Sequence, residues 1–157
     1  MKVGITGHQE REGIDWKWVR SLLNKILANK PALVGYSSLA AGTDQIFAEA
    51  LLSNGGQLKA VLPIKEYEAF FEGAALQEYE RLLTLSEKIE LKSLKGNEQA
   101  FLDAGKWIVE HSDEMIAVWD GEQAEGKGGT GDIVAYAISL GKPVIHINPI
   151  SRETIGL

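Results

Sequence analysis

Apolar residues along this chain follow two kinds of spacing, short β-branched runs and longer stretches with a helical repeat. From Trp16 to Leu27 the apolar positions recur every three or four residues, which predicts a helix that Asp15 caps. The same spacing predicts helices over 43–53, 66–86 with a break near Gly73, 97–111 and 130–140. Short apolar runs predict strands over 2–6, 32–38, 58–63, 88–93, 114–119 and 143–147.

Strands and helices that alternate in this way predict an α/β fold. Such a chain pairs its strands in parallel through right-handed crossovers, so helices cover both faces of the sheet. We therefore expect a three-layer, doubly wound, Rossmann-like sheet of about six mostly parallel strands, built as a single domain over 1–157. The last ten residues, 148–157, are expected to form a loose tail. The charge alternation in "EKIELKSLK" is typical of a solvated edge strand.

Composition narrows the classes of function. The 157 residues include no cysteine and three scattered histidines, so neither a disulfide framework nor a protein metal site is expected. A formal net charge of −6 disfavours sequence-independent binding to nucleic acid. The sequence has no run of roughly 20 apolar residues that would cross a membrane and no basic-then-apolar leader. We expect a cytoplasmic protein with a small-molecule partner.

Three polar loops follow predicted strands at what should be one edge of the sheet. They read "TGHQ", "SSLAAGTD" and "DGEQAEGKGGTGD", and all three are rich in Gly, Ser, Thr or Asp. The opposite edge carries ordinary helix ends such as "NKPA", "SNGG" and "LGKP". Ligands of open α/β sheets bind outside the carboxyl ends of the strands. The asymmetry therefore predicts a ligand site at the edge with the polar loops.

The third of these loops contains four glycines in seven residues, "GKGGTGD", just before a predicted helix. Exposed amides and the positive end of a helix dipole favour an anion there. Gly128, Gly129 and Thr130 would supply amides and a hydroxyl to a phosphate, and Lys127 a mobile charge. The alternative is a surface loop in which Thr130 only caps the helix.

The other two loops supply further candidates, each with a structural alternative. The ligand-binding candidates are Thr6, Gly7, His8, Ser37, Ser38, Gly42, Thr43, Asp44 and Asp120. Asp44 would accept hydrogen bonds from sugar hydroxyls or a base amine, or else it caps the second helix. Asp120 follows a strand directly, as a site residue would, but "DG" is also an ordinary turn.

In this order, "GITGH", "SSLAAGTDQIFAEALL", "AVLP", "HSDEMIAVWDG" and "GGTGD" resemble the SLOG superfamily. This Rossmann-like group includes the DNA-processing protein A (Smf) and LOG ("lysine decarboxylase-like") proteins. The resemblance implies the strand order 3-2-1-4-5-6 and a nucleotide or nucleotide-derived ligand. Its phosphate would lie near Gly128 to Thr130 and near Gly7.

The sequence departs from the LOG pattern "PGGxGTxxE" at the positions that matter for catalysis. LOG enzymes cleave the N-glycosidic bond of nucleoside monophosphates, but Ala135 stands at their glutamate position and Asp132 at their threonine. Asp44, Asp120 and Asp132 remain candidate catalytic carboxylates, since such a hydrolase needs one. A ligand sensor or carrier is therefore the first interpretation. A phosphoribohydrolase is the alternative, and a single-stranded nucleic-acid binder is the weakest.

Aromatic residues are the remaining candidates. Tyr67, Phe70, Phe71 and Tyr79 follow the third strand and would either form a flap over a base or pack in the core, which their helical spacing favours. Trp107 and Trp119 are expected in the core. A homo-oligomer is compatible with the sequence, although no helix shows a clear exposed apolar stripe.

Overall fold

The computed structural model describes residues 1–30, 32–123 and 129–157, and a seven-stranded sheet runs through it. The strand order is β4-β3-β2-β1-β5-β6-β7. All neighbours pair in parallel except β6 and β7, which are antiparallel. The strands are β1 (Lys2–Gly7), β2 (Val34–Ser37), β3 (Gln57–Leu62), β4 (Glu87–Glu90), β5 (Glu114–Val118), β6 (Val144–Asn148) and β7 (Glu153–Gly156).

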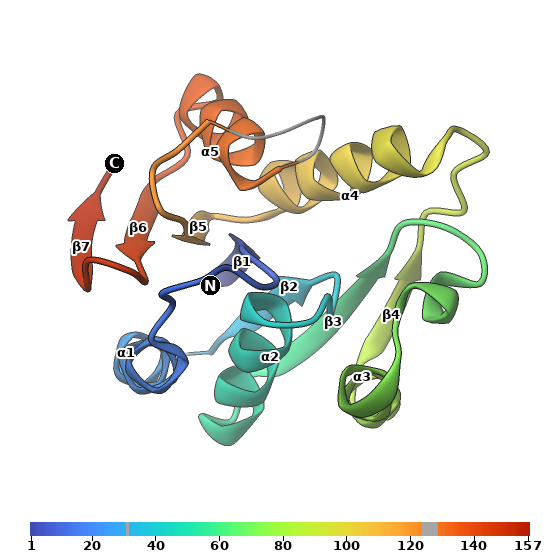
Figure 1. Cartoon of the computed structure of the whole chain (residues 1–157), viewed down its shortest axis with the longest axis horizontal. Helices are drawn as coiled ribbons and strands as arrows, with labels where there is room; N and C mark the ends of the chain where they lie inside the picture. Colours follow the sequence, from blue (N-terminus) through green and yellow to red (C-terminus); the bar gives the residue numbers. More distant parts are fainter. Residues whose placement is uncertain (31, 124–128) are drawn as a thin grey trace.

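Helices cover both faces of this sheet, as the alternating pattern predicts. The helices are α1 (Trp16–Ala28), α2 (Thr43–Ser53), the 3-10 helix η1 (Tyr67–Phe70), α3 (Gly73–Thr84), α4 (Asn97–His111) and α5 (Thr130–Ser139). Helices α1, α2 and α3 lie on one face, and α4 and α5 lie on the other (Figure 1). The three-layer, Rossmann-like α/β architecture is therefore confirmed. None of the described helices is long and apolar enough to cross a bilayer.

The central strand β1 shows how the two faces of the core are filled. Val3 and Ile5 are buried in the cluster that also contains the inward residues of α1 and α2. Gly4 faces the other way, where a Cβ would collide with the side chains of Ile108 and Ser112. The small residue lets α4 lie directly on β1, because strand residues alternate between the two faces of a sheet.

The strand order implied by the resemblance is wrong at one position. It places the fourth strand beside β1, whereas β4 pairs with β3 at the edge of the sheet and β5 occupies the place beside β1. Three of the four β4 residues are exposed and its sequence is EKIE, which suits a solvated edge better than a position between buried strands. The charge pattern of this segment therefore predicts its place correctly.

The loose tail expected over 148–157 is also wrong. Residues Glu153–Gly156 form β7, which pairs antiparallel with β6 from Ile145 to Asn148. The reversal is made by Asn148, whose side-chain oxygen accepts hydrogen bonds from the N–H groups of Ile150 and Ser151 at 3.0 and 3.1 Å. An Asx-type turn of this kind reverses the chain and brings the final residues back onto the sheet.

Gly42, in the loop after β2, packs closely against Gln9 in the loop after β1. Its φ is +83°, and a Cβ there would collide with the backbone carbonyl oxygen of Gln9. Both the left-handed backbone and the close approach therefore require glycine.

Replacing Gly42 by alanine is expected to lower the free energy of unfolding by about 2 to 4 kcal/mol, since strain at a positive φ is combined with a backbone collision. Urea unfolding followed by circular dichroism measures the change. Gly156→Ala is the matched control, because a Cβ at Gly156 meets open space and its φ is not positive. Equal stability of the two variants would contradict the packing of Gly42 on Gln9.

Candidate functional site

A cleft of about 730 Å³ opens at the carboxyl ends of the central strands. Its walls come from the residues that end or follow β1, β2, β3 and β5, from the start of α5, and from one side of α4. This is the edge at which the three polar loops of the sequence predict a ligand site, and where ligands of open α/β sheets bind.

Seven of the predicted ligand-binding residues line this cleft, and they come from all three of the polar loops. They are Thr6, Gly7, His8, Ser38, Asp44, Gly129 and Thr130. Gly129 is the N-cap residue of α5, with no side-chain cap, and Thr130 is the first residue of that helix. The first amides of α5 therefore belong to the cleft wall, where an anion would be favoured. Gly128 and Lys127 lie outside the described residues.

Three predicted residues serve the architecture instead of the cleft. Thr43 is fully buried, and its hydroxyl donates to the His8 carbonyl oxygen at 2.8 Å. The buried Ser37 hydroxyl donates to the Asp44 carbonyl oxygen and accepts from the Leu39 N–H, both at 3.1 Å. Gly42 lines a separate, more open groove of about 550 Å³. Their polar atoms hold the loops in place, which sequence spacing alone does not reveal.

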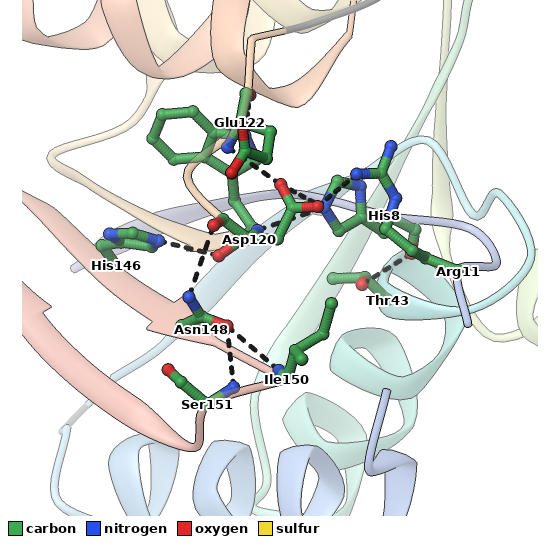
Figure 2. Close-up of polar contacts among 10 residues, drawn as sticks. His8, Arg11, Thr43, Asp120, Glu122, His146, Asn148, Ile150 and Ser151 are labelled. Carbon is green, nitrogen blue, oxygen red and sulfur yellow. Dashed lines mark hydrogen bonds and ion pairs between the residues drawn. The ribbon is translucent and has the colours of Figure 1, made fainter. Parts of the chain in front are cut away.

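The Asp120 side chain pairs with other residues of the protein, although its position directly after β5 predicts a contact with a ligand. Figure 2 shows its carboxylate between His8 and Arg11, both from the loop after β1. The Arg11 guanidinium pairs with Oδ2, the Glu122 N–H donates to Oδ1 at 3.0 Å, and the Asp120 N–H donates to His8 Nε2 at 3.2 Å. Asp120 thus fastens the loop after β5 to the loop after β1.

The protonation states in this cluster follow from the same contacts. Burial raises the pKa of Asp120, but the Glu122 N–H, Arg11 and His8 outweigh it and hold that pKa below its usual range. Burial is also the largest influence on His8, and it lowers the pKa of the ring despite the opposing charge of Asp120. A neutral His8 ring that accepts the Asp120 N–H at Nε2 keeps its Nδ1–H for another partner.

Asp44 has a different environment from the other two candidate carboxylates. It lines the cleft, and its Oδ2 accepts the Ala40 N–H at 3.3 Å. Burial raises the pKa of Asp44 to about 7, although the Ala40 N–H opposes the shift. Neither Asp120 nor the exposed Asp132 lines the cleft, and Ala135, at the LOG glutamate position, is exposed outside it. Among the described residues, Asp44 is therefore the predicted carboxylate best placed to contact a ligand.

Aromatic side chains form one wall of the cleft, although their helical spacing favours a place in the core. Tyr67, Phe70 and Phe71 line it together with Phe101 of α4. Tyr67 is buried and packs edge-on against Phe71 and Phe101, with ring centroids 5.0 and 6.1 Å apart. Phe70 is 50% exposed. The core interpretation is therefore correct for Tyr67 and wrong for Phe70, while Tyr79 is buried and lies outside the lining.

Neither Phe101, Arg11 nor Trp119 was identified as a site residue from the sequence, yet all three line the cleft. Phe101 lies on α4, far along the chain from the polar loops, so only the packing of α4 on the sheet brings it there. For the aromatic residues of η1, the sequence signal that could identify them as lining residues is their place after β3, at the same edge of the sheet as the polar loops.

The described lining carries more negative than positive groups. Its carboxylates are Glu10, Asp44, Glu72 and Glu122, and its one Lys or Arg side chain is Arg11, which is already paired with Asp120. No cluster of three His, Asp or Glu side chains in the described part of the chain could hold a metal ion. The cleft offers backbone amides, a cluster of aromatic side chains and a carboxylate, a combination that suits a small organic ligand better than a polyanion.

Solved structures resemble this arrangement, although no family model and no curated protein matches the sequence. DNA processing protein A from Streptococcus pneumoniae matches with a TM-score of 0.66 and 21% identity, over 94% of this chain and 50% of that one. The molybdenum cofactor binding protein of Rippkaea orientalis matches with a TM-score of 0.58 and 21% identity, over 94% and 76%. The chain shares the Rossmann-like fold of these proteins.

The other similar structures agree with this fold. DNA processing protein A from Helicobacter pylori, described as binding single-stranded DNA, has a TM-score of 0.66 at 16% identity, over 98% of this chain and 68% of that one. The Moco carrier protein of Chlamydomonas has a TM-score of 0.57 at 17% identity, over 93% and 74%. The chain described here spans half the length of the Streptococcus protein. The resemblance deduced from the motifs is confirmed as a shared fold.

Ionisation of Asp44 is expected to destabilise the folded chain as the pH rises. The pKa rises from its ordinary value of about 4 to about 7 in the folded state. Between these values the folded chain binds more protons than the unfolded chain, so the free energy of unfolding falls with pH and levels off above about 7.

Asp44→Asn removes this titration and keeps an oxygen for the Ala40 N–H. At pH 8 the variant is expected to unfold with a free energy at least about 1 kcal/mol higher than the wild type, and the gain should vanish near pH 4. Urea unfolding across this pH range measures the difference, with Glu153→Gln on the exposed strand β7 as the control. If the difference in unfolding free energy between Asp44→Asn and the wild type does not change with pH, this result would contradict the burial of the Asp44 carboxyl.

Proposed function

We propose that this chain binds a nucleotide or a nucleotide-like phosphorylated small molecule in the cleft. The supporting observation is that one cleft joins a cluster of aromatic side chains, including the half-exposed Phe70, to the amino-terminal turn of α5. Aromatic faces stack on planar heterocycles, and helix amino termini bind phosphates. The chain would act as a ligand sensor or carrier.

Two structural neighbours support a carrier role, since they are described as molybdenum cofactor binding or carrier proteins. Single-stranded DNA binding, described for the Helicobacter protein, is less well supported here. A polyanion needs basic side chains along its path, while the described lining offers four carboxylates and one arginine already paired with Asp120. A hydrolase of N-glycosidic bonds would have to use Asp44 as its carboxylate.

The proposal is tested first by thermal unfolding against nucleoside mono-, di- and triphosphates, sugar nucleotides and inorganic phosphate. A ligand at about 100 times its dissociation constant stabilises the folded state by roughly 2.7 kcal/mol, which should raise Tm by about 5 to 10 °C. Chromatography of the same mixtures detects a released base, which would show hydrolysis. No shift with any compound would overturn the proposal.

Thr130→Glu is expected to abolish this shift, because a carboxylate at the first residue of α5 repels the phosphate. The variant should still fold, since a negative charge favours the start of a helix. Thr154→Glu adds the same charge on the exposed strand β7 and should leave the shift unchanged. A shift in Tm equal to that of the wild type in Thr130→Glu would show that the phosphate does not bind at the start of α5.

Phe70→Ala is expected to weaken binding of a purine nucleotide about tenfold, because stacking of a base on an aromatic ring contributes roughly 1 to 3 kcal/mol. Leu94→Ala is the control, since Leu94 is 99% exposed and lies outside the cleft lining. Calorimetric titration compares the two variants with the wild type. Equal affinities would show that the aromatic wall does not contact the base.

A further inference from the structure

Asp44 carries a hydrogen-bonding capacity that the protein itself leaves unused. Its Oδ2 accepts the Ala40 N–H, and among the described residues no hydrogen-bond donor is found for Oδ1. The residue lines the cleft, so its carboxylate borders the space in which a ligand would bind. An ionised carboxylate only accepts hydrogen bonds, and a ligand group that satisfies it must therefore bring donors.

The neighbours of Asp44 favour a flat ring at this end of the cleft. Asp44 and Tyr67 line the same cleft, and the charge of Asp44 is, after burial, the largest influence that raises the pKa of the Tyr67 hydroxyl. Tyr67 is in turn the ring around which Phe70, Phe71 and Phe101 gather, at centroid distances of 5.0 to 6.3 Å. A carboxylate beside an aromatic wall can bind the edge of a heterocycle whose face stacks on that wall.

The phosphate end of the cleft lies on the other side of β1. Asp44 begins the helix after β2 and Tyr67 follows β3, whereas Gly129 and Thr130 follow β5. In the strand order, β2 and β3 are on one side of β1 and β5 is on the other. A nucleotide that spans the cleft would therefore place its base near Asp44 and its phosphate near Thr130.

Building on the proposed function, we propose that Asp44 selects a heterocycle that presents two adjacent donors, a ring N–H and an exocyclic amino group, as guanine does. One N–H can donate to Oδ1 and the other to Oδ2, which would then be shared with the Ala40 N–H, because each carboxylate oxygen can accept more than one hydrogen bond. Adenine presents one donor beside an acceptor nitrogen, whose lone pair would face the carboxylate. A ribose diol also brings two donors, but it has no flat face for the neighbouring aromatic rings.

Calorimetric titration with GMP, IMP, XMP and AMP tests this selectivity. The measurement is made at about pH 8, because the pKa of Asp44 is about 7 and the carboxylate is then mostly ionised. GMP is expected to bind at least tenfold more tightly than IMP, which lacks the amino donor, and more tightly still than XMP or AMP. XMP replaces the amino donor with an oxygen that faces the carboxylate.

Asp44→Asn converts one acceptor of this pair into a donor and has nearly the same shape. The variant should lose at least tenfold in affinity for GMP and gain in affinity for XMP, whose second oxygen now meets an amide donor. A gain of binding cannot result from misfolding, so the test holds even if the variant is less stable. Glu72→Gln, which removes a different lining carboxylate, should leave the order of the four nucleotides unchanged.

Each other outcome overturns the inference in a recognisable way. If GMP and AMP bind equally and both weaken in Asp44→Asn, the carboxylate contacts ribose, and the proposed function stands without base selection. If both the wild type and Asp44→Asn prefer GMP, a residue other than Asp44 selects the base. If AMP is preferred, the donor match is wrong. If no purine nucleotide binds, the inference fails, and the wider panel of compounds decides whether the proposed function fails with it.

Discussion

The backbone of His8 is the junction on which the site depends. Its carbonyl oxygen accepts both the N–H and the hydroxyl of Thr43, at 3.2 and 2.8 Å, and its own N–H donates to the Val118 carbonyl oxygen at 3.1 Å. One residue after β1 thus joins the start of α2 to the end of β5. The loops at the edge of the sheet take fixed positions because these bonds are buried or half-buried, where an unmade hydrogen bond is costly.

This junction explains why several residues with ligand-binding chemistry do not face the cleft. Thr43 and Asp120 use their polar groups on the loop after β1. Ser37 uses its hydroxyl on the segment that leads into α2. These bonds fix the loops that carry groups of the cleft lining, among them His8 and Asp44. The polar residues at this edge of the sheet therefore form two groups. Some fix the loops through hydrogen bonds, and others line the cleft.

The cleft is chemically unequal from end to end, and the strand order is the cause. On the side of β2 and β3 lie the aromatic rings of η1 and the raised-pKa carboxyl of Asp44. On the side of β5 lies the helix amino terminus of α5. A ligand with one flat end and one anionic end fits this polarity, and the excess of carboxylates in the described lining disfavours a long polyanion. Neighbours with the same fold are described as handling DNA or the molybdenum cofactor, so the fold alone does not choose between such ligands.

Local patterns in the sequence were enough to predict the helices, the three layers and the polar edge of the sheet at which the cleft opens. Spacing of apolar residues and loop composition act over a few residues, so they do not depend on the rest of the chain. The charge of EKIE likewise marks β4 as an edge strand. Tertiary structure alone decided that β7 closes the sheet, that Phe101 reaches the cleft from α4, and which polar side chains remain free. Those outcomes depend on partners distant in sequence, such as Asp120 for Arg11 and His8 for Thr43, and no local pattern encodes a partner.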